Sequence, residues 1–347
     1  MRYGFWLPIF GGWLRNVDDE QMPPTFDYVK EVIQSAEKWG YDTTLIAELY
    51  LNDIKGPERD SLEAWSTAAA LAAVTDSIEI MAAVRPNFHN PAVTAKMAST
   101  IDHISNGRFT LNVVSAWWQE EARQYGGAFT EHDERYDRTD EFLQILKGLW
   151  SQDTYSFQGK FYHVADTQLQ PKPIQAPTIY AGGESPRGKQ TISQYCDAYV
   201  MHGGTVEEIS QKISDMKERR LQVTSTPFQS FGMAAYVICR DTEEEALEEL
   251  KRITQVKQSS AYAGYKDFTS KSQLEQQVEL LDYSVSNRGL RPNLIGTPNQ
   301  IAEKIIDYEE VGLDLLLLQC SPQLEEMERF SKQVMPLVEE KRKETQT

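Results

Sequence analysis

Residues 78–114 read IEIMAAVRPNFHNPAVTAKMASTIDHISNGRFTLNVV, and this stretch decides the fold. The apolar runs Ile78–Val84 and Phe109–Val114 predict two buried strands, and Pro91–Ile104 between them has the length and pattern of a helix. A strand, a helix and a second strand in this order form a βαβ unit. Its two strands lie parallel in a sheet that is buried on both faces.

The same alternation continues toward both ends of the chain. Eight strands of this kind fit a closed (β/α)8 barrel, the TIM-barrel architecture of the α/β class. An open doubly wound sheet is the alternative, but the Gly-x-Gly-x-x-Gly phosphate signature that should follow its first strand is missing. We therefore predict a single TIM-barrel domain over residues 1–347. The other expected strands are Tyr3–Phe10, Thr43–Leu49, Thr178–Gly182, Ala198–Met201, Phe231–Cys239 and Leu313–Cys320, and further helices are expected at Phe26–Trp39, Ser61–Val74, Glu131–Trp150 and Leu324–Glu340.

Two segments interrupt this alternation. Within residues 151–177, the stretch Tyr155–Val164 predicts an inserted hairpin. Residues 259–293 are polar and lack a clear hydrophobic period. Because a segment of that length in a compact barrel is usually functional, we expect it to form a lid over the active site.

The charge of the chain limits its partners. The 347 residues include 35 Lys and Arg against 52 Asp and Glu, a formal net charge of −17. An acidic surface repels phosphate backbones and anionic lipids, which argues against nucleic-acid and membrane partners. We find no signal-peptide pattern and no apolar run of membrane-spanning length, and the three cysteines lie far apart, as suits a reducing compartment. We therefore predict a cytoplasmic protein.

Residues that follow barrel strands face the active site in this fold. Here many of them are aromatic or carry amides, such as Trp13, Asn52, Asn87 and Asn112, and carboxylates do not cluster among them. The five histidines lack metal-ligand spacing, and neither a Gly-x-Ser-x-Gly elbow nor a Walker loop is present. Metal-dependent, serine-dependent and nucleotide hydrolysis are thus disfavoured. A cofactor is expected to carry the chemistry.

Three stretches are candidates for cofactor binding, each with a structural alternative. Ala181–Ser185 offers glycine N–H groups and a hydroxyl at a helix N-terminus, which suits a phosphate or a plain N-cap equally well. Asn112, inside a buried strand, satisfies either backbone groups or a ligand. The Trp117-Trp118 pair favours packing over ring stacking. Glu131–Arg138, which contains His132, Arg135 and Tyr136, is either an exposed charged helix start or an anion grip.

Several motifs together resemble the bacterial-luciferase-like flavin monooxygenases. The similarity is greatest to their two-component branch, which holds dimethyl-sulfone, alkanesulfonate and pyrimidine monooxygenases. The motifs are Thr100–Arg108, Asn112–Trp117, Glu131–Phe142, Pro171–Pro173, Gly182–Ser185 and Asn293–Pro298.

This resemblance implies a TIM barrel that binds reduced FMN (FMNH2) supplied by a separate NAD(P)H:flavin reductase. The flavin would react with O2 to give a peroxyflavin that oxygenates a small organosulfur compound, a sulfone or an alkanesulfonate, in sulfur metabolism. Members of the family commonly form oligomers, so a dimer or tetramer is expected.

The resemblance also assigns roles to residues. Asn112 would contact the flavin, and Arg135, Tyr136 and Ser185 would hold or neighbour its phosphate. The full set of expected cofactor-binding residues is Glu48, Leu49, Asn112, Ser115, Glu121, Arg135, Tyr136, Gly182, Gly183 and Ser185. Arg291 of the expected lid would meet a substrate anion, with His202 and Tyr236 as reserve proton donors.

The chain departs from the pattern of these relatives at the expected substrate pocket. Leu49 stands where the sulfone and pyrimidine enzymes carry a basic residue. Ala234 and Tyr236 replace an Arg-x-His, and Ser321–Gln323 replaces a Tyr-Pro-His of the alkanesulfonate enzymes. A sulfonate needs fixed positive charge, so these losses argue against a plain alkanesulfonate unless Arg291 or its neighbour Arg288 restores the charge.

Two other functions are compatible with the same barrel. One is a hydride-transferring oxidoreductase that uses the deazaflavin F420, although the acidic composition argues against binding its polyglutamate tail. The other is a non-catalytic flavin-binding protein that has lost its substrate pocket.

Overall fold

The computed structural model describes residues 1–115, 118–127, 129–257, 260–262, 264–271, 278–286 and 289–345, and it confirms the predicted TIM barrel. Eight parallel strands pair in the order β9-β11-β1-β2-β3-β4-β7-β8, and β8 pairs with β9 to close the ring. A short strand, β10 (Leu294–Gly296), pairs with the carboxyl end of β9. The barrel strands are β1 (Arg2–Trp6), β2 (Thr43–Ile46), β3 (Glu79–Val84), β4 (Phe109–Val113), β7 (Ile179–Ala181), β8 (Ala198–Met201), β9 (Phe231–Cys239) and β11 (Leu315–Gln319).

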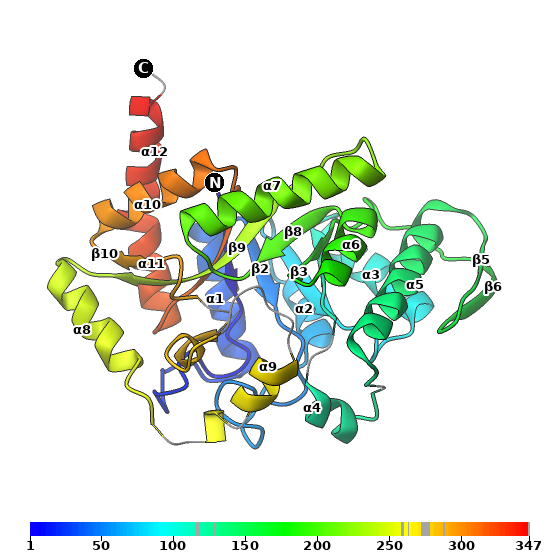
Figure 1. The fold of residues 1–347 in the computed structure, drawn as a ribbon, viewed down its shortest axis with the longest axis horizontal. Coiled ribbons are helices and arrows are strands. Elements are labelled where there is room, and N and C mark those ends of the chain that lie inside the picture. The colour runs from blue at the N-terminus through cyan, green and yellow to red at the C-terminus, as the bar shows by residue number, and fades with distance from the viewer. Residues whose placement is uncertain are drawn as a thin grey trace.

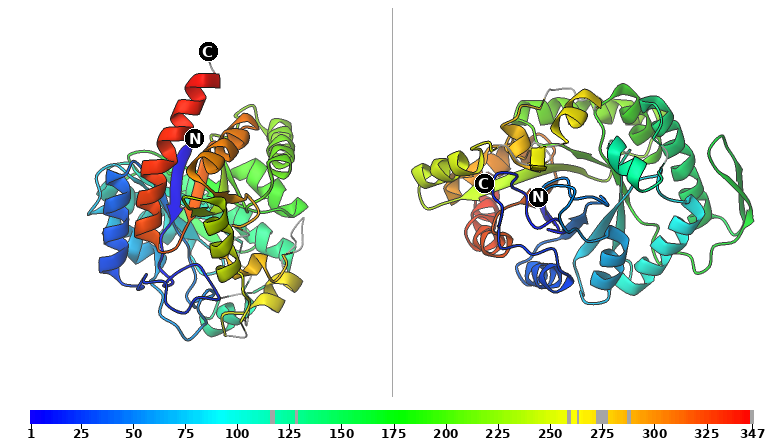
Figure 2. Two further views of the ribbon diagram at one scale, coloured as in Figure 1. Left: turned by 90° about the vertical axis from the view of Figure 1, so that its left-hand side faces the viewer. Right: turned by 90° about the horizontal axis from the view of Figure 1, so that it is seen from below.

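Helices surround this barrel, and Figure 2 shows the ring that they form around the strands. In Figure 1 both chain termini lie at one end of the barrel, while α4 and α9 lie at the opposite end. The helices are α1 (Phe26–Lys38), α2 (Ala64–Ala72), α3 (Pro91–Ser105), α4 (Gln119–Gln124), α5 (His132–Ser151), α6 (Pro186–Tyr195), α7 (Val206–Val223), α8 (Glu243–Ile253), α9 (Tyr265–Lys271), α10 (Pro298–Glu310), α11 (Gln323–Gln333) and α12 (Met335–Thr345).

Apolar side chains fill the interior of the barrel between its strands. Leu45, Met81 and Leu317 come from three different strands and are buried in one cluster. At Gly4 of β1 a Cβ atom would stand 2.6 Å from the side chain of Thr43 and 2.7 Å from that of Leu317. The barrel is therefore solid at this level, as in other TIM barrels, and the open end is the carboxyl one.

Local sequence signals set several element boundaries. The side chain of Asn90 accepts hydrogen bonds from the first N–H groups of α3, and Asn106 ends that helix with a left-handed φ of 57°. We expected α2 to begin at Ser61, but it begins at Ala64 because the Glu63 side chain caps it. The first strand was expected to reach Phe10. It ends at Trp6, because Pro8 lacks the N–H that a strand needs.

The inserted hairpin is confirmed. Strands β5 (Tyr155–Gln158) and β6 (His163–Thr167) pair antiparallel and stand outside the helix ring, next to α5 (Figure 1). The described part of the expected lid contains the turns Ser260–Tyr262 and Asp282–Ser284 around α9. Arg288 lies outside the described residues.

No helix in the described part of the chain is long and apolar enough to cross a membrane. The three cysteines are all buried and free. The described residues contain no group of three or more His, Cys, Asp or Glu that could hold a metal ion.

Candidate active site

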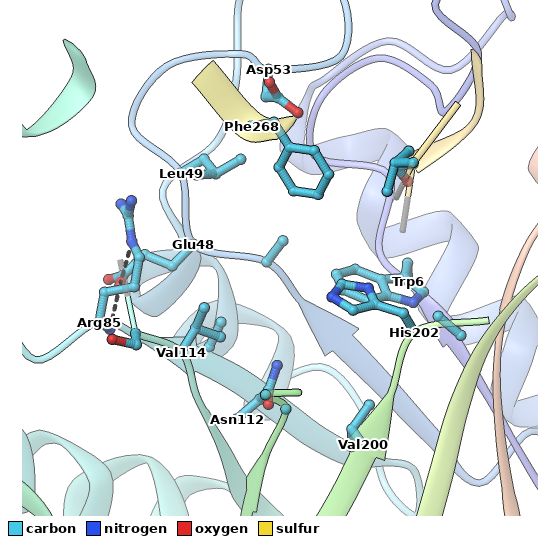
Figure 3. A pocket seen from close by; sticks show the side chains of 18 of the residues that line it. Trp6, Glu48, Leu49, Asp53, Arg85, Asn112, Val114, Val200, His202 and Phe268 are labelled. Carbon is cyan, nitrogen blue, oxygen red and sulfur yellow. Dashed lines mark hydrogen bonds and ion pairs between the residues drawn. The ribbon is translucent and has the colours of Figure 1, made fainter. Parts of the chain in front are cut away.

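A cavity of about 270 Å³ lies at the carboxyl ends of the barrel strands (Figure 3). Most of its exposed wall surface is apolar, and polar and charged side chains are interspersed among the apolar ones, as small-molecule sites need for orienting a ligand. The predicted site residues that line it are Glu48, Leu49, Asn112, Ser115, Arg135, Tyr136, Gly182, Gly183, Ser185 and His202.

Asn112 lies at the floor of the cavity. It belongs to β4, between Ala83 of β3 and Tyr180 of β7, and its amide faces the cavity near Val114 and Val200 (Figure 3). Asn112 Oδ1 is buried, and no described residue donates a hydrogen bond to it. A buried amide with an open acceptor is costly unless a ligand satisfies it. The Asn112 amide can accept a hydrogen bond from an N–H group and donate one to a C=O group at the edge of a planar ring.

The loop from β7 to α6 forms a small cradle, Gly182, Gly183, Ser185 and Tyr136. Ser185 caps α6 by accepting the Gly188 N–H at 3.1 Å, and Tyr136 hydrogen-bonds to Ser185. Burial raises the pKa of Tyr136, so its hydroxyl stays protonated and can donate. A Cβ on Gly183 would stand 3.0 Å from Tyr136 Oη, so glycine leaves this space open.

This cradle has the features of an anion site. It joins a helix N-terminus to two hydroxyls and to loop N–H groups that approach without side chains in the way. The guanidinium of Arg135, on the same helix as Tyr136, also lines the cavity and packs 4.7 Å from the centre of the Phe129 ring. Ser185 is the N-cap of α6 and also lines the cavity, so a role in phosphate binding stays a prediction that its position allows.

Buried charges form a cluster at the side of the cavity. Arg85 donates from its backbone N–H to Glu48 Oε2 at 2.8 Å, and His89 Nε2 lies 2.5 Å from Glu48 Oε1. The guanidinium of Arg85 also contacts both carboxylate oxygens of Glu121, with Nη2 at 3.3 Å. Figure 3 shows Arg85 beside Glu48 at the cavity wall. The cluster fixes the Glu48 carboxylate where β2 ends.

Three predicted site residues do not line the cavity. Glu121 is fully buried behind Arg85, accepts the Tyr50 N–H at 2.5 Å and pairs with the Arg85 guanidinium. Arg291 pairs with Glu208 of α7. Tyr236 is 1% exposed, and its backbone N–H donates to Gly289 O at 2.8 Å, because the segment around Gly289 packs over this part of β9.

Other residues reach the cavity that the sequence did not identify as site residues. Arg15 lines it together with Asp53, and Arg15 Nη2 lies 2.7 Å from Asp53 Oδ2. Phe268 and Tyr283 come from the segment expected to be a lid, which is the one sequence signal that pointed toward them. Of the tryptophan pair, Trp118 is buried, which agrees with packing, and Trp117 lies outside the described residues.

Comparison with known proteins adds family information to this geometry. Residues 1–315 match the model of the family described as luciferase-like monooxygenase. The FMNH2-dependent dimethylsulfone monooxygenase of Pseudomonas putida is 34% identical, covering 98% of this chain and 96% of that protein. The enzyme of the same name from Pseudomonas fluorescens is 33% identical, covering 98% of this chain and 95% of that protein. The crystal structure of a long-chain alkane monooxygenase matches with a TM-score of 0.82 at 20% identity, over 98% of this chain and 91% of that one.

Proposed function

Because the chain belongs to the luciferase-like monooxygenase family, we propose that it uses reduced FMN and O2 to oxygenate a small, uncharged organosulfur compound of the sulfone type. The observation that carries this proposal is the cradle at the N-terminus of α6, placed in one cavity with the Asn112 amide. The relatives that match over nearly the whole chain are named FMNH2-dependent, which favours FMN over F420.

The residues of the cavity fit FMN. Ser185, Tyr136 and the N–H groups at Gly182 and Gly183 would hold the phosphate, with Arg135 adding positive charge. Asn112, with its open acceptor, would bind the polar edge of the flavin ring. The remaining walls are mainly apolar, which suits the flat ring faces.

Reduced FMN, when bound, supplies the two electrons that allow O2 to deliver one oxygen atom to the substrate and the other to water. The protein contributes binding, orientation and the exclusion of water. The cradle anchors one end of the cofactor, and the Asn112 amide sets the position of its ring. The apolar walls and the Phe268 side chain of α9 keep bulk water from the reacting atoms. This exclusion prevents the loss of O2 as hydrogen peroxide.

The charges around the cavity support an uncharged substrate. Among the described residues, the two arginines at the sides of the cavity already face carboxylates: Arg15 pairs with Asp53, and Arg85 with Glu48 and Glu121. Arg135 lies beside the cradle and would serve the phosphate. A sulfonate would need a cation of its own. A sulfone carries no net charge and needs only hydrogen bonds.

The proposed cofactor implies a separate flavin reductase as partner, since the chain must receive FMN in its reduced form. The proposal also includes a homo-oligomer, as the family resemblance implies. No described contact favours F420 chemistry or a purely flavin-binding role.

Anaerobic titration with FMNH2, oxidised FMN and F420, followed by absorbance, tests the cofactor. Preferential binding of FMNH2 is expected, and Tyr136→Phe should weaken it; preference for F420 would refute the proposal. Turnover with a flavin reductase then tests the substrate, with dimethyl sulfone against methanesulfonate. Product should form from the sulfone, while a preference for the sulfonate would contradict the charge argument.

A further inference from the structure

Phe268 covers the cavity on the side opposite Asn112. It projects from α9 into the cavity, facing Leu49 and Trp6 (Figure 3), while Asn112 lies at the floor. Since the cradle and Asn112 would bind the cofactor, the space left for a substrate lies between the floor and Phe268. The ring of Phe268 is therefore the apolar ceiling of that space.

The position of this ceiling is set by Tyr283. The ring centres of Phe268 and Tyr283 are 5.7 Å apart, with their planes inclined at 40°. Tyr283 is 6% exposed, and its ring also contacts Tyr265 at the start of α9, with 5.0 Å between centres. Phe268 thus packs against a buried ring that is itself held in place.

Arg15 fixes Tyr283 by two contacts, one with its ring and one with its backbone oxygen. Its guanidinium lies 3.9 Å from the centre of the Tyr283 ring, and its Nε donates to Tyr283 O at 2.8 Å. It also donates to Ala261 O at 2.9 Å and pairs with Asp53 at 2.7 Å. The Arg15 side chain is 2% exposed, so these contacts lie in a region of low dielectric constant, where ion pairs and hydrogen bonds hold their geometry. Arg15, in the loop after β1, therefore links Ala261 and Tyr283, which flank α9, to Asp53 in the loop after β2.

We propose that Phe268 sets the upper size limit of the substrate, and that Arg15 positions Phe268 through Tyr283. This inference rests on the proposed function, because it assumes that the cofactor occupies the cradle and the floor. A close-packed wall rejects added methylene groups, since the surrounding side chains resist displacement. One methylene group changes selectivity by roughly 10–200-fold in apolar enzyme pockets. Dimethyl sulfone should thus be accepted and longer dialkyl sulfones rejected.

The test compares dimethyl, diethyl and dipropyl sulfone in the wild type and in Phe268→Ala, Phe268→Leu and Arg15→Lys. In the wild type kcat/KM should fall steeply with chain length. Phe268→Ala should raise the ratio of dipropyl to dimethyl sulfone by about tenfold or more, and Phe268→Leu by less. Arg15→Lys, which keeps the charge but loses the planar stacking on Tyr283, should shift the ratio in the same direction. Leu281→Ala, an exposed position of the same segment, is the matched control and should leave the ratio unchanged.

An unchanged ratio in Phe268→Ala would overturn the proposal, and an unchanged ratio in Arg15→Lys would overturn the positioning role of Arg15. If the wild type oxidises none of the three sulfones, the proposed function fails. The size limit is then decided by binding: ligand-observed NMR on the FMN-loaded protein should show dipropyl sulfone bound by Phe268→Ala and not by the wild type. Equal binding to both proteins would refute it.

Discussion

Replacing Arg85 with methionine should lower the free energy of unfolding by about 3–5 kcal/mol. Arg85 is 1% exposed and lies between the carboxylates of Glu48 and Glu121, which are also buried. Without the guanidinium, the Glu121 carboxylate loses the one cation that pairs with it among the described residues, and among these Glu48 keeps only its side-chain contact with His89. Breaking a buried ion pair by removing one partner costs this much because the remaining charge is uncompensated.

A matched control lies on the helix that carries Glu121. Arg123 pairs with Glu120 at the surface, where the two side chains are 68% and 45% exposed, so solvent screens the pair and Arg123→Met should leave the free energy of unfolding nearly unchanged. Urea unfolding followed by tryptophan fluorescence and by circular dichroism measures both variants. In the double variant Arg85→Met/Glu121→Gln part of the stability should return, because one of the two charges is gone. If Arg85→Met costs no more than Arg123→Met, the cluster does not hold this wall of the cavity as we describe.

Three further predictions concern the cofactor, the covering segment and pH. Ser185→Ala and Tyr136→Phe should each raise the Kd for FMN, measured by flavin fluorescence, by about 10–150-fold. The reason is that a hydrogen bond to a charged group contributes about 1.5–3 kcal/mol. A Kd within threefold of the wild-type value would show that the cradle does not bind the phosphate. Arg291→Ala should change the ratio of product to O2 consumed by less than twofold, because Arg291 pairs with Glu208. A collapse of this ratio in the variant would instead support the predicted contact of Arg291 with a substrate anion. Burial raises the pKa of Asp102 above its value in the unfolded chain. The charged carboxylate therefore lowers the free energy of unfolding at a pH above the folded-state pKa. This loss shrinks as the pH falls through the folded-state pKa and is gone below the unfolded-state pKa. Asp102→Asn should therefore stabilise the protein at pH 7 and not at low pH, and urea titrations at the two pH values check this.

The sequence predicted the features that depend on neighbouring residues. The strand Ile78–Val84 and the helix that follows it are recognisable because their apolar pattern and caps lie within the segment. The cradle at Gly182–Ser185 could be predicted for the same reason, since its glycines, its cap and its helix start are consecutive. The predicted ends of helices were less accurate where a single capping side chain sets the first residue, as Glu63 does for α2.

The sequence predicted that residues 259–293 cover the site, but the contacts that hold this segment could not be predicted, because their residues meet only in the folded chain. Arg15 and Tyr283 are 268 positions apart, and no local pattern relates them. The family resemblance assigned Glu121 to cofactor binding, and only the fold shows that its carboxylate, on α4, contacts Arg85. Arg291 was expected to meet a substrate anion, and in the structure it pairs with Glu208 of α7. Both roles stay predictions, and the Arg291→Ala variant tests the second of them.

This cavity, as we propose, couples reduced FMN and O2 to oxygenation of a sulfone. A sulfone sulfur cannot accept a further oxygen atom while both of its C–S bonds remain, so the oxygen enters a methyl C–H bond, and the hydroxymethyl sulfone then splits into methanesulfinate and formaldehyde. The most direct measurement is turnover of dimethyl sulfone with a flavin reductase, NADH and O2, in which both products and hydrogen peroxide are quantified. We expect one methanesulfinate and one formaldehyde for each sulfone consumed, and less hydrogen peroxide for each O2 consumed when the sulfone is present. Recovery of all consumed O2 as hydrogen peroxide whether or not the sulfone is present, or the same products formed without O2, would contradict this function.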